Sequence, residues 1–424
     1  MDFDALIRFL KAHGHNCTLL WYTELPRFHG LPTTDADPPD FTVEPHPWLR
    51  TGPGLATDGK PKFDLTKFNP EYFDRVRDRV RALAKAGIYV GVYFFTGEWI
   101  LRFRCPSDGY PFSGPNNISG VDDGYRDKSS ALSSVTMTAP NPITGFQDEY
   151  VKKLIDTLND LPNVLWIVSE EAPTASTWWN EHLISLVRAY EKGKPFQHPI
   201  GYATLGERPN DAILYDSAAD WIAPWARISP ARSSGTGSPS TKVIINDSDH
   251  SYYLMWNDTL QQNRNYLWEN FASGSQVLFM DPYLVNWPKW RRNLCLAPVR
   301  GIGSAPDPRY DNFRDNLGYL VRYSRKLNLA AVTPRGELSS TGYCLAQTPA
   351  VGAEYLVYAP DGGSFTLDLS AMPNSRSLAV EWFNPADGKA ITQGPVPAGS
   401  PSRSFSAPFH GDAVLYAVDV AGHN

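Results

Sequence analysis

The stretch NVLWIVSEEAP (residues 163–173) decides the fold, because it joins a short apolar run to two adjacent carboxylates and a proline. An apolar run of this length, rich in Val, Ile and Trp, predicts a strand buried on both faces of a parallel sheet. Successive strand residues point to opposite faces, so at most one of Glu170 and Glu171 is expected to face the interior. The question is which of the two does so, and for what chemistry.

Strand-like and helix-like segments alternate along the chain. Strands are predicted at residues 16–24, 88–95, 163–171, 199–206, 219–226, 242–250 and 275–283. Helices are predicted at residues 1–16, 69–87, 145–160, 177–193, 258–272 and 309–328. This alternation implies parallel pairing and predicts an α/β fold, a (β/α)8 TIM barrel whose first strand is missing from this chain. A doubly wound open sheet is the competing topology, which the lack of a GxGxxG turn after the early strands disfavours.

The pattern changes near residue 330. Short alternating segments separated by Gly, Pro, Asn and Asp replace the helical periodicity, as in YCLAQT, EYLVYAP and DAVLYAVDV. This pattern is typical of an antiparallel β-sandwich. The sequence therefore predicts a barrel domain at residues 1–330 and a small β-sandwich domain at residues 331–424.

Composition narrows the possible partners. The net charge of -6 comes without a basic run, which argues against nucleic acid, and no apolar stretch is long enough for a membrane span. The 13 Trp and 21 Tyr suit a surface that contacts a small or neutral ligand. Four scattered cysteines indicate neither a zinc site nor a redox pair, although one disulfide is compatible with them. No cofactor is expected.

Acidic residues stand at the ends of several predicted strands, which is where barrel enzymes place their active sites. These acids are Glu24, Glu98, Glu170, Glu171, Asp247, Asp249 and Asp281. Carboxylates that converge on an aromatic-rich cleft suggest glycoside hydrolysis, which needs a protonated acid on one side of the bond and a carboxylate on the other. A metal site at DSDH (residues 247–250) is the alternative, but no second His cluster stands at another strand end.

The strand order resembles that of a large clan of retaining glycosidases with (β/α)8 barrels, which includes cellulase-like and apiosidase-like families. With the missing strand counted as the first, NVLWIVSEE is the fourth strand and KVIINDSDH (residues 242–250) is the seventh. In that clan the fourth strand typically ends in Asn-Glu, with Glu as acid/base, and the seventh usually ends in a nucleophilic Glu. The resemblance implies Glu171 as acid/base and Asp247 as the second catalytic carboxylate.

Other segments extend the resemblance over nearly the whole chain. FLKAHGHNCTLLWYTE (residues 9–24) and PFSGPNNISGVDDG (residues 111–124) look like segments of these barrels. EWFNPADGK (residues 381–389) and PFHGDAVLYAV (residues 408–418) resemble the small C-terminal β domain that is called collagen-binding in such proteins. We infer no collagen partner from that inherited name.

Two residues depart from the clan's pattern. Glu170 replaces an Asn that donates a hydrogen bond to the substrate, whereas an ionised carboxylate can only accept one. On the inner face it would raise the pKa of neighbouring acids and help Glu171 stay protonated. Asp247 is shorter than Glu, which favours the gap of about 6.5–9.5 Å of an inverting pair over the roughly 5–5.5 Å of a retaining pair. Retention is what the resemblance implies, and Asp249 or Asp281 is the alternative partner.

Other side chains complete the expected site. His250 is a further group that orients a carboxylate or binds substrate. The predicted sugar-binding side chains are Trp21, Trp99, Asn116, Asn117, Trp225, Trp256 and Trp287. Plain core packing for Trp and turn formation for Asn are the structural alternatives.

The sequence therefore predicts a glycoside hydrolase that acts on an oligo- or polysaccharide. The alternative is a non-catalytic carbohydrate-binding or cell-surface protein on a degenerate glycosidase barrel, and the third candidate is a metal-dependent hydrolase. A polysaccharide-degrading role favours secretion or the periplasm, although residues 1–16 do not resemble a signal peptide.

Overall fold

The computed structural model describes residues 2–20, 26–28, 41–97, 109–125, 132–170, 172–203, 211–224, 242–247, 259–279, 281, 310–349, 351–398 and 401–420. The chain divides into two compact units. The first comprises Met1–Ile7, Cys17–Trp225 and Asp281–Asp307, and the second comprises Arg8–Asn16, Ala226–Met280 and Pro308–Asn424. The boundary of a separate domain at residue 330 stays a prediction.

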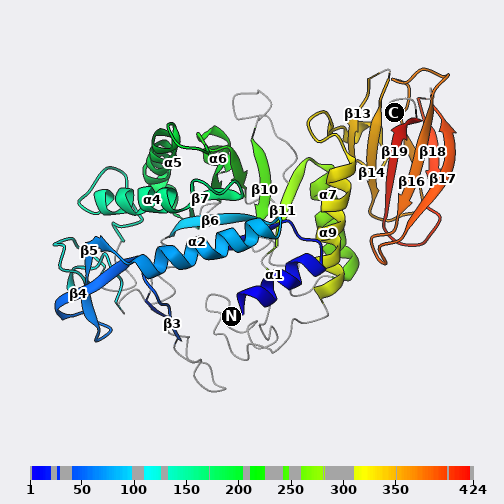
Figure 1. The fold of residues 1–424 in the computed structure, drawn as a ribbon. Helices are drawn as coiled ribbons and strands as arrows, with labels where there is room; N and C mark the ends of the chain where they lie inside the picture. Colours follow the sequence, from blue (N-terminus) through cyan, green and yellow to red (C-terminus); the bar gives the residue numbers. More distant parts are fainter. Residues whose placement is uncertain are drawn as a thin grey trace. The chain divides into compact units, whose positions relative to one another are not determined.

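Seven strands form one curled parallel sheet of the half-barrel kind, in the order β1-β6-β7-β8-β9-β10-β11. They are β1 (Cys17–Leu20), β6 (Tyr89–Thr96), β7 (Val164–Glu170), β8 (Ile200–Ala203), β9 (Trp221–Ala223), β10 (Val243–Asp247) and β11 (Ser275–Leu278). Figure 1 labels β6, β7, β10 and β11 among them. Spatial order follows chain order, as in a barrel. The barrel-type α/β fold is therefore confirmed, and each predicted strand of this sheet is present. The eighth strand stays a prediction.

Helices separate most of these strands, namely α2 (Pro70–Lys85), α4 (Thr144–Leu158), α5 (Thr177–Glu191), α6 (Asp211–Asp216) and α7 (Leu260–Ala272). Helix α1 (Phe3–Ala12) precedes β1, and α9 (Asp311–Lys326) follows β11. Local sequence explains their ends: the Asn69 side chain accepts a hydrogen bond from the Glu71 N–H before α2, and Pro70 takes its first position. Thr259 and Gln262 form a capping box at the start of α7. None of the helices described above has the length and hydrophobicity that a bilayer crossing requires.

The segment between β1 and α2 corrects one expectation. The sequence pattern predicts neither strand nor helix between residues 24 and 69, but β4 (Trp48–Leu55) and β5 (Pro61–Phe68) form an antiparallel hairpin there. Asp58 and Gly59 form its turn, where Gly59 has a φ of +77°. A short pair, β2 (Arg27–Phe28) with β3 (Phe41–Thr42), precedes the hairpin. The Asp-Gly signal for a hairpin was therefore present in the sequence.

One face of the parallel sheet packs against helices. The ring of Phe95 on β6 lies 5.4 Å from that of Tyr150 on α4 and 5.4 Å from that of Trp179 on α5. Gly91 allows β1, β6 and β7 to pack closely, because a Cβ atom there would lie 2.6 Å from Leu19 Cδ2 and 2.9 Å from Ile167 Cδ1. Phe95 of β6 therefore points toward the helices.

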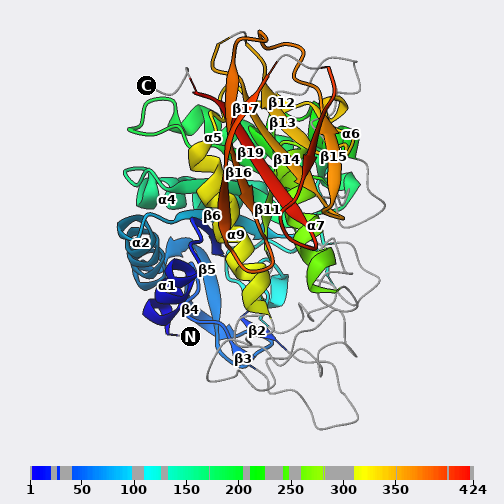
Figure 2. The ribbon, with the colours of Figure 1, turned by 90° about the vertical axis from the view of Figure 1, so that its right-hand side faces the viewer.

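The C-terminal part is built from two antiparallel sheets. The larger has the order β12-β13-β14-β19-β16-β17 (Figure 2). The smaller pairs β15 with β18. The strands are β12 (Thr333–Pro334), β13 (Cys344–Gln347), β14 (Glu354–Ala359), β15 (Ser364–Leu367), β16 (Ser377–Phe383), β17 (Ala390–Pro397), β18 (Arg403–Ser406) and β19 (Ala413–Asp419). The predicted antiparallel strands are confirmed.

Each face of the six-stranded sheet contributes to a different core. On one face, side chains such as Val357 and Trp382 pack with Phe365 and Phe405 of the two-stranded sheet. On the other, residues such as Phe383 pack with aromatic side chains of α7 and α9. Every residue of β14 and β19 is buried, as expected for central strands covered on both sides.

Helix α9 meets the end of α1 at a glycine. A Cβ atom on Gly318 would lie 2.0 Å from the carbonyl oxygen of His13, a backbone atom that cannot rotate away. Two hydrogen bonds connect the segment after α1 to α9. His13 Nδ1 donates to Asp315 Oδ1 at 2.7 Å, and His15 Nε2 donates to the Arg314 carbonyl oxygen at 2.9 Å. This close approach of α9 to the end of α1 therefore requires glycine at position 318.

Gly318→Ala is expected to lower the free energy of unfolding by about 1–3 kcal/mol, because the methyl group forces α1 and α9 apart. This loss outweighs the roughly 1 kcal/mol by which Ala is preferred over Gly in a helix. Urea unfolding measures it. Gly145→Ala in α4 is the matched control, since nothing lies within 4 Å of a Cβ atom there. A Gly318→Ala protein as stable as the control would contradict this interpretation.

Candidate active site

The carboxyl ends of the parallel strands define the edge at which a barrel enzyme places its active site. Glu170 ends β7 and is the register neighbour of Thr96, which ends β6. Both side chains are buried, with 1% of their surface exposed. A carboxyl group thus lies inside the protein at this edge.

The orientation of Glu170 follows from its neighbours along the strands. Ser169 Oγ donates a hydrogen bond to Asn180 Oδ1 on α5 at 2.6 Å, and Phe95 packs on the same helix layer. Successive strand residues alternate between faces, so Glu170 and Thr96 lie on the face opposite the helices. Glu170 therefore points away from the helices, toward the inner face of the sheet. Glu171 follows the last strand residue, so strand alternation does not fix its direction.

Most of the other predicted site residues lie outside the described part of the chain. These are Trp21, Glu24, Glu98, Trp99, Glu171, Trp225, Asp249, His250, Trp256 and Trp287. Asp247 ends β10, and its side chain also lies outside the described part. Asp281 follows β11 and is half-buried. The roles assigned to these residues stay predictions.

Asn116 and Asn117 are part of the loop that follows β6, and both are buried. Asn116 Oδ1 accepts hydrogen bonds from the N–H and hydroxyl groups of Thr57, and its Nδ2 donates to the Tyr110 carbonyl oxygen. Asn117 Nδ2 contacts the carbonyl oxygens of Pro111, Ser113 and Val121 at 3.0–3.1 Å. These amides hold the loop together, and the geometry gives no support to substrate contact by them.

Asp123 organises the same loop and was not among the predicted residues. Its Oδ1 accepts hydrogen bonds from Ser113 Oγ at 3.0 Å and from the Tyr125 N–H at 3.1 Å. Burial raises the pKa of Asp123, although these donors oppose the shift. Its sequence context, Asp-Asp-Gly, indicates a turn and carries no sign of burial.

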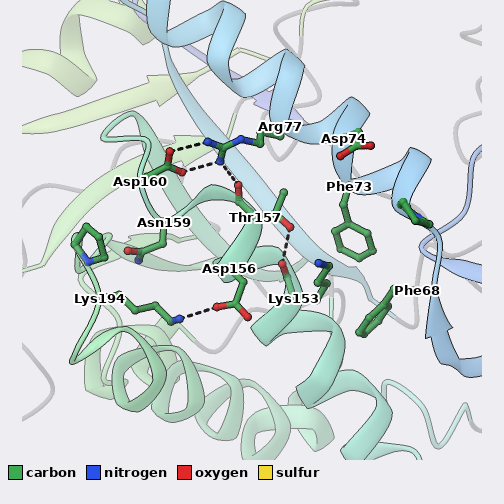
Figure 3. A pocket seen from close by; sticks show the side chains of 12 residues that line it. Phe68, Phe73, Asp74, Arg77, Lys153, Asp156, Thr157, Asn159, Asp160 and Lys194 are labelled. Carbon is green, nitrogen blue, oxygen red and sulfur yellow. Dashed lines mark hydrogen bonds and ion pairs between the residues drawn. The ribbon is translucent and has the colours of Figure 1, made fainter.

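A groove of about 690 Å³ lies between α2 and α4 (Figure 3). Two ion pairs lie in its lining: Arg77 donates two hydrogen bonds of 2.6 Å to Asp160, and Lys194 Nζ lies 2.6 Å from Asp156. The hydrogen bonds to Arg77 lower the pKa of Asp160. The groove is lined by these helices and by residues that precede β7 and β8, so it is separate from the strand ends where the predicted acids lie.

A second buried cluster of titratable groups lies before β8. Glu191 Oε1 accepts hydrogen bonds from Trp166 Nε1 at 3.0 Å and Asn159 Nδ2 at 2.9 Å, and lies 2.8 Å from His198 Nδ1. Burial is the largest single influence on Glu191 and favours its protonated form. Together, however, the hydrogen bonds from His198 and Trp166 hold its pKa below the ordinary value of 4.5. The cluster joins the ends of α4 and α5 to β7.

Glu191→Gln is expected to flatten the acid limb of the pH dependence of stability. A depressed carboxyl pKa stabilises the folded state above the unfolded-state value of 4.5, and this stabilisation is lost as the pH falls through the lower folded-state pKa. At pH 7 the variant should be about 1–3 kcal/mol less stable, and the difference should shrink below pH 4.5. Urea unfolding at both pH values measures this. Exposed Glu149→Gln is the control, and equal slopes in Glu191→Gln and the natural protein would contradict the role.

In the part of the chain that the structure describes, no group of three or more His, Cys, Asp or Glu side chains is arranged to hold a metal ion. Cys17 and Cys344 are free thiols there, and burial raises the pKa of each to about 12. Nucleophilic chemistry by these two cysteines is therefore disfavoured.

The fold matches a defined class of enzymes. A glycoside hydrolase family 5 protein from Bacteroides vulgatus ATCC 8482 superposes with a TM-score of 0.61 at 15% sequence identity, over 100% of this chain and 87% of that chain. Another solved structure, named glycoside hydrolase, gives a TM-score of 0.58 at 15% identity, over 99% of this chain and 90% of that chain. At such identity the similarity shows the fold, which is that of family 5 and related glycoside hydrolases.

The C-terminal part matches a family of its own. Residues 338–416 match the family described as "Putative collagen-binding domain of a collagenase". No curated protein matches the chain. The predicted resemblance to a glycosidase barrel followed by this β domain is thereby confirmed.

Proposed function

We propose that this protein is a glycoside hydrolase that cleaves a glycosidic bond in an oligo- or polysaccharide. The observation that carries the proposal is the inward-facing, buried Glu170 at the carboxyl end of β7, in a chain with a glycoside hydrolase fold. Glu171 directly follows it, and Asp247 ends β10 in the same sheet. Carboxylates at the carboxyl ends of barrel-type strands suit this chemistry.

In the proposed mechanism Glu171 protonates the leaving oxygen and Asp247 acts from the opposite side of the sugar. A retaining reaction has Asp247 attack the anomeric carbon, after which Glu171 removes a proton from the water that hydrolyses the intermediate. An inverting reaction has Asp247 activate that water directly. The negative charge of Glu170 would favour the protonated form of Glu171.

The test is hydrolysis of a panel of aryl glycosides and oligosaccharides by the purified protein. Turnover of at least one substrate, unaffected by chelators, is expected. The anomeric configuration of the first product, followed by NMR, decides between retention and inversion. Binding of a glycan without turnover would instead favour a non-catalytic carbohydrate-binding protein, a candidate that Glu170 in place of the usual Asn motivates. Activity that chelators abolish would favour a metal-dependent hydrolase.

A further inference from the structure

A buried pair of amides joins α7 to β10, one residue before Asp247. Asn246 Nδ2 on β10 donates a hydrogen bond of 2.5 Å to Asn270 Oδ1 on α7. Both residues are buried, and Asn270 Nδ2 donates to the Tyr266 carbonyl oxygen at 2.8 Å. That second bond fixes which way the Asn270 amide points, because a carbonyl oxygen can only accept. The position of β10 is thus coupled to the position of α7.

Helix α7 is in turn tied to the C-terminal sheet by a buried ion pair. Arg264 Nε lies 3.0–3.1 Å from both carboxylate oxygens of Asp412, and its Nη2 donates to Asp412 Oδ1 at 2.7 Å. Asp412 immediately precedes β19 and is 0% exposed. The Tyr358 hydroxyl on β14 donates to Asn265 Oδ1 at 2.7 Å. Paired, multiply hydrogen-bonded charges of this kind hold two elements in one geometry.

Among the described residues, both faces of the central strands of the six-stranded sheet are covered. One face packs on the two-stranded sheet and the other packs on α7 and α9. A module that binds a ligand across a sheet needs an open face. The packing of these strands instead suits a structural role.

We propose that the C-terminal sheet braces α7, and that Asn270 and Arg264 are positioning residues that hold β10 and hence Asp247 for catalysis. The chain of contacts runs from Asp412 to Arg264, along one helix to Asn270, and from there to Asn246. The catalytic part of this inference rests on the proposed glycoside hydrolase function, whereas the mechanical part does not.

The experiment compares Asn270→Leu and Arg264→Met with the natural protein by hydrogen exchange and by kinetics. Amides of Val243–Asp247 are expected to exchange about 10-fold faster in both variants, because β10 loses its anchor. On a hydrolysed substrate, kcat should fall about 10-fold or more while KM changes less than twofold, since small misplacements of a catalytic group slow the chemical step. Tyr358→Phe, which removes only a hydroxyl, should give a smaller effect at the same amides.

Arg376→Met is the matched control, because Arg376 pairs with Asp419 within the C-terminal sheet at 2.6 Å and Asp419 is also buried. It should leave β10 exchange unchanged. Unchanged hydrogen exchange of β10 in folded Asn270→Leu or Tyr358→Phe would contradict the proposal that the C-terminal sheet holds α7 in place. An equal increase in β10 exchange in Arg376→Met would also contradict it. Faster exchange with unchanged kcat would overturn the positioning role. If no substrate is hydrolysed at all, the proposed function fails. The exchange data still show whether the C-terminal sheet holds α7 and β10 in place.

Discussion

Glu171→Gln is expected to lower kcat by about 10²–10⁴-fold on substrates with poor leaving groups, because an amide cannot donate the proton that the departing oxygen needs. Gln and Glu have nearly the same size, so the fold should be unaffected. Steady-state hydrolysis of an oligosaccharide or alkyl glycoside measures the loss. Undiminished turnover would remove Glu171 from the acid/base role.

The leaving group separates the two proposed roles. A dinitrophenyl glycoside departs as a stable phenolate and needs no protonation, so Glu171→Gln should still cleave it rapidly in the first turnover. Asp247→Asn should be slow on both kinds of substrate, because both need the second carboxylate whatever their leaving group. Stopped-flow release of dinitrophenolate measures this. Equal losses of the two variants on the activated substrate would contradict the assignment of roles.

Glu170→Gln decides between the two adjacent acids. Glu170 faces inward, and its proposed effect on Glu171 is electrostatic. Its replacement should therefore shift the pH dependence of kcat and cost less activity than Glu171→Gln. The pH profile of kcat for each variant provides the comparison. A larger loss for Glu170→Gln than for Glu171→Gln would exchange the two roles.

The sequence predicts the parallel sheet well because the relevant signals are local. The apolar run before Ser169, the cap at Asn69 and the glycine at residue 87 are each readable within a few residues. The β4–β5 hairpin was missed although Asp58-Gly59 marks its turn, since the flanking strands lack a clear alternation of apolar and polar residues.

The site is harder to predict because its contacts are distant in the chain. The sequence predicts that Asn116 binds sugar. In the structure its Oδ1 accepts a hydrogen bond from the N–H of Thr57, which is 59 residues away. The pairing of Arg264 with Asp412 spans 148 residues, and no sequence period relates the two. Alternation, by contrast, is local, and together with the contacts of Ser169 and Phe95 it gives the direction of Glu170.

Trp268→Ala is expected to give the largest loss of stability, about 3–5 kcal/mol, because it empties the centre of the core between α7, α9 and the six-stranded sheet. The indole ring lies 5.6 Å from the ring of Tyr323 and 5.7 Å from that of Phe383. Its Nε1 donates to Asn316 Oδ1 at 2.9 Å. Truncation therefore leaves a cavity and also an acceptor without its donor, which adds to the cost.

Two variants separate these contributions and locate the effect. Trp268→Phe keeps most of the ring and loses the N–H group, so it should cost about 1–3 kcal/mol in urea unfolding. Trp382→Ala empties the opposite core, where Trp382 packs against the ring of Phe365 at 5.9 Å. Hydrogen exchange should show faster amides in α7 and α9 for Trp268→Ala, and mainly in the antiparallel strands for Trp382→Ala. If α7 and α9 kept their slow exchange in Trp268→Ala while the C-terminal strands opened, the antiparallel sheet would be a separately folding domain that begins near residue 331.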